Sequence, residues 1–121
     1  MTEACVLVVD DEPGMRETLV EILGASGYAV AAAADGEEAL DMLRARPFDV
    51  VLMDIRMPGR DGVSVLQELG GPPPRVILMT AYTHAERIRE GLEAMAFAVV
   101  TKPFPVPELL GLVASAATTP G

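Results

Sequence analysis

The sequence predicts an α/β fold with a single doubly wound sheet of five parallel strands and five helices. Short apolar segments alternate along the chain with segments whose apolar residues recur at helical spacing, as in repeated strand–helix–strand units. Right-handed crossovers between parallel strands place helices on both faces of such a sheet. The predicted strands cover residues 5–9, 28–33, 50–53, 75–79 and 98–101.

Local signals indicate where the first two helices begin. The first strand runs into Asp10, and Pro13 suits the first turn of the following helix, where no backbone N–H donor is needed. Glycines end that helix by Gly27. After the second strand, Asp35 and Glu38 form a capping box, which predicts the start of the second helix.

The third strand is predicted to deliver Asp54 to its carboxyl end. Four apolar residues precede Asp54, and Pro58 and Gly59 turn the chain soon after it. A continuous apolar run bounded by turn residues is typical of a strand buried on both faces. Open α/β sheets bind their ligands beyond the carboxyl ends of their strands, so a chemical role is expected for this carboxylate.

The last two strands carry polar residues to the same edge of the sheet. The fourth strand delivers Thr80, and the fifth delivers Lys102. Further helices are predicted for residues 63–69 and 83–95, and a last helix should begin at Val106 or Pro107. Small residues from position 114 onward are expected to form a tail.

Length and composition indicate one cytoplasmic domain. Of the 121 residues, about 3–117 are expected to fold, with 118–121 as a tail or the start of a linker. A formal net charge of −9 argues against direct nucleic-acid binding. No apolar segment is long enough to cross a membrane, and no secretion signal is recognisable. The single cysteine, Cys5, is expected to be buried and suits a reducing compartment.

Three carboxylates at one sheet edge, from Asp10, Asp11 and Asp54, would repel one another. Two unit charges about 5 Å apart repel by roughly 3 kcal/mol at an effective dielectric near 20. Lys102 supplies only one positive charge against them. Oxygen ligands suit Mg²⁺ better than zinc, which prefers histidine or cysteine. A Mg²⁺ site is therefore predicted, which Mn²⁺ could also occupy.

The same group of residues suits phosphoryl transfer. An aspartate beside a divalent cation is a competent nucleophile toward phosphorus. The cation, Lys102 and the Thr80 hydroxyl with nearby backbone N–H groups could each neutralise one of the three phosphoryl oxygens. Every group needed to accept a phosphoryl group is therefore present in the sequence.

Four motifs stand in order at successive strand ends: Asp10-Asp11, Met53-Asp54-Ile55-Arg56-Met57-Pro58-Gly59 with Asp61-Gly62, Met79-Thr80-Ala81, and Thr101-Lys102-Pro103-Phe104. Together they make the chain resemble, over almost its whole length, the response-regulator receiver domains of two-component signalling. The resemblance implies a flavodoxin-like strand order of 2-1-3-4-5. It also implies a phosphoacceptor signalling domain rather than a conventional enzyme. The partners would be a histidine kinase or histidine phosphotransfer protein and an unknown output domain or protein.

The resemblance further assigns roles to the site residues. Asp54 would receive the phosphoryl group, which Thr80 and Lys102 would then bind. The Lys102–Pro103 peptide bond is expected to be cis, an isomer that proline makes accessible. The Mg²⁺ ligands would be Asp10, Asp11, Asp54 and the backbone carbonyl of Arg56.

Some positions depart from the receiver pattern or tune it. Receivers usually carry an aromatic residue where this chain has Val99, so the aromatic half of the usual switch is missing. Pro105 replaces the more usual polar cap before the last helix. Arg56 and Tyr82, each two residues beyond a key site residue, occupy positions that tune phosphoryl lifetime in receivers.

The sequence also bears on two other functions, a phosphatase and an interaction module. Phosphatases of the haloacid-dehalogenase type need a second aspartate two residues after the nucleophile, where this chain has Arg56. The remaining alternative is a receiver-like interaction module that signals without phosphorylation, which Val99 permits and the intact acidic pair argues against. A weak homodimer through the fourth helix, fifth strand and fifth helix is left open.

Overall fold

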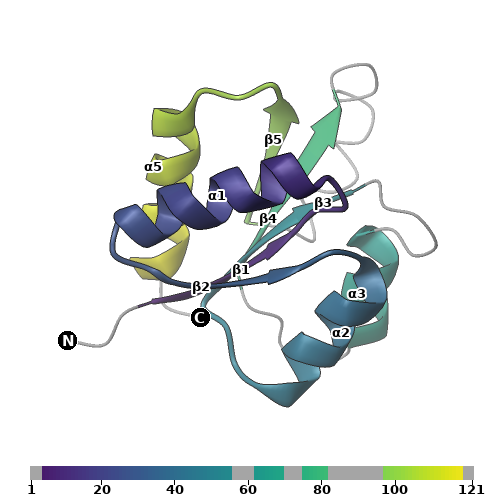
Figure 1. Cartoon of the computed structure of the whole chain (residues 1–121). Coiled ribbons are helices and arrows are strands. Elements are labelled where there is room, and N and C mark those ends of the chain that lie inside the picture. The colour runs from purple at the N-terminus through teal and green to yellow at the C-terminus, as the bar shows by residue number, and fades with distance from the viewer. Residues whose placement is uncertain (1–3, 56–61, 70–74, 82–96, 119–121) are drawn as a thin grey trace.

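The fold is a five-stranded parallel sheet in the order β2-β1-β3-β4-β5, as predicted (Figure 1). The computed structural model describes residues 4–55, 62–69, 75–81 and 97–118. Every neighbouring pair of strands is parallel, so all five carboxyl ends meet at one edge. The strands are β1 (Cys5–Val9), β2 (Ala29–Ala33), β3 (Val50–Asp54), β4 (Arg75–Ala81) and β5 (Ala98–Lys102).

Helices cover both faces of the sheet within the described residues. Side chains of α1 and α5 pack on one face with Val6 and Leu52, whereas α2 and α3 pack on the other with Leu7 and Met53 (Figure 1). Successive strand residues point to opposite faces, so a continuous apolar strand fills both cores. The bounds are α1 (Pro13–Ala25), α2 (Gly36–Ala45), α3 (Gly62–Leu69) and α5 (Val106–Thr118). The fourth helix predicted over residues 83–95 lies outside the described residues.

The predicted helix starts are confirmed. Pro13 opens α1, and the backbone N–H of Glu38 donates to Asp35 Oδ1 at 2.8 Å at the start of α2. The last helix begins at Val106, and the Pro105 carbonyl accepts a hydrogen bond from the backbone of Leu109 at 3.2 Å. In the described ranges, no helix is both long and apolar enough to cross a membrane.

Some predicted boundaries were wrong at the ends of strands and helices. Tyr28 does not begin β2, because its backbone N–H donates to Leu23 and closes the turn after α1. The β4–β5 ladder continues through Ala81 and Lys102, so Thr80 lies within a strand. Helix α5 continues to Thr118, beyond the expected start of the tail at position 114, because alanine favours helix.

Cys5 also differs from its prediction. It begins β1 and is half-buried, packing beside the core rather than inside it. Its backbone is well fixed, since its N–H donates to Asp49 Oδ2 at 2.7 Å and its carbonyl accepts from the Asp49 backbone at 2.9 Å. Those bonds join the amino ends of β1 and β3.

Two glycines give a matched test of the backbone. Gly111 lies inside α5 with open space around an added Cβ, so Gly111→Ala should stabilise the fold by about 0.8–1 kcal/mol. Gly27 also has open space but adopts φ +99°, so Gly27→Ala should destabilise it by about 1 kcal/mol. Urea unfolding followed by circular dichroism measures both. A loss of stability in Gly111→Ala would contradict the helix assignment there.

Candidate functional site

Four predicted site residues come together at the carboxyl edge of the sheet. Asp10 follows β1, Asp54 ends β3, Thr80 is next to last in β4, and Lys102 ends β5. The parallel register brings these positions to one edge because all strands run the same way. Asp10, Asp54 and Thr80 are 0%, 8% and 3% exposed, so three polar residues are buried here.

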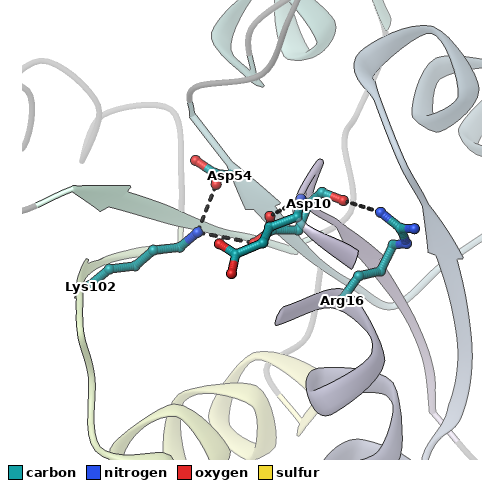
Figure 2. A network of polar contacts seen from close by, with 5 residues as sticks. Asp10, Arg16, Asp54 and Lys102 are labelled. Carbon is teal, nitrogen blue, oxygen red and sulfur yellow. Dashed lines mark hydrogen bonds and ion pairs between the residues drawn. The ribbon is translucent and has the colours of Figure 1, made fainter. Parts of the chain in front are cut away.

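Lys102 bridges the buried carboxylates of Asp10 and Asp54. Its Nζ donates to Asp54 Oδ2 at 2.7 Å and to Asp10 Oδ2 at 3.0 Å (Figure 2). The side chain of Lys102 is only 20% exposed, and that of Asp10 is fully buried. Water therefore screens this ion pair less than it screens a surface pair, and the attraction is correspondingly stronger.

Asp10 is held at each of its polar atoms. Its N–H donates to the Ala33 carbonyl at 3.2 Å, and its own carbonyl accepts from Arg16 Nη1 at 2.8 Å. Its Oδ1 accepts from the backbone of Glu12 at 2.9 Å, and its Oδ2 accepts from Lys102. Figure 2 shows Arg16 and Lys102 approaching Asp10 from opposite sides. The orientation of this carboxylate is therefore fixed.

The ion pairs alter the acidity of Lys102. Partial burial disfavours the charged ammonium and lowers its pKa, but hydrogen bonds to Asp54 and Asp10, together with their negative charges, outweigh burial. The pKa of Lys102 is therefore raised above its ordinary value. The stabilisation from these contacts is complete below the unfolded pKa of about 10.4, and it is lost as pH rises through the folded pKa.

The acidic residues fit a hydrated divalent cation. Asp10, Asp11 and Asp54 each offer one carboxylate oxygen, and these oxygens lie within 4.8 Å of one another. Oxygen ligands gathered this closely are the donor set that a Mg²⁺ ion would take, with waters completing its coordination. Asp11 is exposed, which leaves this side of the cluster open to the waters that Mg²⁺ retains.

The structure locates some of the remaining predicted residues. Val99 is 6% exposed and belongs to the core cluster between the sheet and helices α2 and α3. The Lys102–Pro103 peptide bond is cis, as expected. Arg56 and Tyr82 lie outside the described residues.

Arg16 and the Glu12 N–H are contacts that the sequence analysis missed. Arg16 lies in the first turn of α1 but six residues after Asp10, a separation without a standard pairing rule. The only available signal was a basic side chain in the helix that follows an acidic pair.

Comparison with known proteins supports the same assignment as the site geometry. A family model described as "Response regulator receiver domain" matches residues 6–114. The chain belongs to this receiver family. Its response-regulator relatives and its fold place the receiver domain in signal transduction by two-component systems.

Individual relatives differ in length. Sporulation initiation phosphotransferase F of Bacillus subtilis is 38% identical over 106 residues, covering 86% of both proteins. Regulatory protein AtoC of Escherichia coli is 42% identical over 106 residues, but the receiver domain spans 23% of it. A solved receiver domain protein from Clostridium thermocellum has 26% identity and a TM-score of 0.85, covering 94% of each chain. The chain thus matches most of one relative and about a quarter of the length of another.

The acidity of Lys102 can be measured directly because it is the chain's only lysine. Only an unprotonated amine reacts with acetic anhydride, so the reaction rate of Lys102 should rise at a pH above the ordinary midpoint of about 10.4. Asp54→Asn removes one charge without changing the packing and should lower that midpoint. Mass spectrometry of peptides separates Lys102 from the N-terminal amine. Equal midpoints for Lys102 in the wild type and in Asp54→Asn would show that the contact with Asp54 does not raise the pKa of Lys102.

Proposed function

We propose that this receiver domain accepts a phosphoryl group on Asp54 from a phosphohistidine of a histidine kinase or phosphotransfer protein. The observation that carries the proposal is the contact of Lys102 with both Asp54 and Asp10 at the carboxyl edge of the sheet. The proposed nucleophile Asp54, the ammonium group of Lys102 and the acidic cluster lie within one small volume. Phosphoryl transfer depends mainly on such positioning and charge neutralisation.

The transfer assigns a bond change to Asp54. A carboxylate oxygen of Asp54 forms a bond to phosphorus as the phosphorus–nitrogen bond to the donor histidine breaks, and the imidazole keeps that electron pair. The Asp54 side chain is 11% exposed, so a donor can approach it from the solvent edge. The Lys102 ammonium can follow the charge from the carboxylate to a phosphoryl oxygen.

Mg²⁺ is proposed to be held by Asp10, Asp11, Asp54 and the backbone carbonyl of Arg56, with Mn²⁺ able to replace it. When bound, the cation neutralises negative charge on the phosphoryl oxygens. The support for this assignment is the oxygen cluster of the three aspartates. Asp10 contributes a rigid carboxylate, and Asp11 contributes one that faces solvent.

Output is proposed to follow from the added charge. A phosphoryl group carries about −1.5 to −2 charge at neutral pH. Moving a two-state domain from about 1% to 99% active requires roughly 5.5 kcal/mol of preference for the active state. Lys102 and the buried Thr80 hydroxyl are proposed to supply much of it by contacting the phosphoryl oxygens. A change at Thr80 would pass into β4 and on to an output domain or protein.

Three further positions are proposed to modify this output. Arg56 and Tyr82 would tune phosphoryl lifetime through water access to Asp54. Val99 cannot supply the ring movement of the usual aromatic switch. Because Val99 is packed in the core, its effect would travel through side-chain packing instead.

The phosphoacceptor function is tested by incubating the protein with acetyl phosphate and measuring its intact mass. We expect one added phosphoryl group in the presence of Mg²⁺, none with EDTA and none in Asp54→Asn. Asp41→Asn is the matched control, since it removes the same charge from an exposed position on α2 and should be labelled like the wild type.

Failure to label has a definite meaning. If the wild type gains no phosphoryl group where a known receiver is labelled, the alternative of an interaction module that works without phosphorylation replaces this proposal. Labelling that persists in Asp54→Asn would instead overturn the choice of acceptor.

A further inference from the structure

We propose that Arg16 is a positioning residue for divalent-cation binding, because it fixes the peptide unit between Asp10 and Asp11. This inference rests on the proposed Mg²⁺ site. Within the described residues, the guanidinium contacts the backbone carbonyl of Asp10, to which Nη1 donates at 2.8 Å, rather than the carboxylate oxygens that would bind the ion.

The contact acts at the point where the chain leaves the sheet. Asp10 follows the last residue of β1, so its carbonyl has left the ladder of that strand. Arg16 is anchored in α1, where its own N–H donates to the Glu12 carbonyl at 3.0 Å. The half-buried guanidinium therefore ties the start of the helix back to the end of the strand. Figure 2 shows this contact on the side of Asp10 away from Lys102.

Fixing the carbonyl of Asp10 also orients Asp11. The peptide group is planar, so the direction of the Asp10 carbonyl sets the direction of the Asp11 N–Cα bond. The Asp11 carboxylate is exposed, and among the described residues none holds it by a hydrogen bond or ion pair. The direction of the main chain sets where this carboxylate can reach, and Arg16 holds the main chain at that point.

The charge of Arg16 and its hydrogen bond to Asp10 should have opposite effects on divalent-cation affinity. Its positive charge repels a divalent cation, so removing the charge alone should tighten binding. Loss of the hydrogen bond should weaken binding, because groups that orient metal ligands typically change metal affinity by about 10–100-fold. A weaker affinity in a neutral variant therefore identifies positioning as the dominant role.

The experiment measures Mn²⁺ binding to the full chain from the electron paramagnetic resonance signal of the free ion, with Mg²⁺ as competitor. We expect Arg16→Met to raise the Kd for Mn²⁺ by about 10-fold. Arg16→Lys keeps the charge and one donor, so its Kd should fall between those of the wild type and Arg16→Met. Arg44→Met is the matched control: Arg44 donates to the Glu68 carbonyl at 3.4 Å, between α2 and α3. Its loss changes the net charge equally and should leave the Kd within twofold.

Folding is checked separately by thermal unfolding in EDTA, where no divalent ion contributes. If Arg16→Met is unfolded in EDTA, the Kd for Mn²⁺ of Arg16→Lys is compared with that of Arg44→Lys instead. A Kd at least threefold higher in Arg16→Lys supports the positioning role. A Kd in the neutral Arg16 variant equal to or below that of the wild type overturns the proposal, as does equality of the two lysine variants in the fallback comparison. Failure of the wild type to bind Mn²⁺ or Mg²⁺ would count against the proposed metal site itself.

Discussion

The crowding of buried negative charge at one sheet edge is the constraint on which the site depends. Asp10 is fully buried and Asp54 nearly so, yet both lie within hydrogen-bond distance of the same ammonium group. A buried carboxylate without a partner would cost several kcal/mol, so the ammonium group of Lys102 stabilises the fold by pairing with both. One ammonium cannot neutralise Asp10, Asp54 and the neighbouring Asp11. The remaining negative charge is the feature that supports the proposed divalent-cation site.

The rest of the fold keeps these charges in place. The central strands β1 and β3 are apolar on both faces, and their registered pairing places Val9 beside Met53, directly before the two aspartates. Close-packed cores resist displacement of side chains, so the carboxylates stand on a rigid base. Helix α1 adds a second restraint, because Arg16 and the Glu12 N–H both bind Asp10.

The sequence predicted the strands and the main site residues because both depend on strong local patterns, whereas the strand order followed from the resemblance to receiver domains. Apolar runs marked the strands, and parallel topology then required residues at their carboxyl ends to meet. Strand ends were harder to predict, since backbone hydrogen bonds carry β4 and β5 past their apolar residues to Ala81 and Lys102. Tyr28 was misplaced because its apolar character resembles that of a strand residue, while its N–H belongs to a helix-ending turn. Arg16 was missed because its partner is a backbone carbonyl, which leaves no trace in the residue pattern.

Asp10 and Lys102, on the two sides of the site, differ in how freely their side chains can move. Asp10 is bound at all four polar atoms, and three of its partners belong to the backbone or to Arg16. Lys102 reaches Asp54 with the tip of a long side chain, whose rotation needs no movement of β5. Under the proposed function, an arriving phosphoryl group would draw the ammonium toward itself while the Asp10 side stayed fixed. A rigid acidic side and an adjustable basic side would let the domain gain charge on Asp54 without rebuilding the sheet edge, and would direct the response toward β4 and β5.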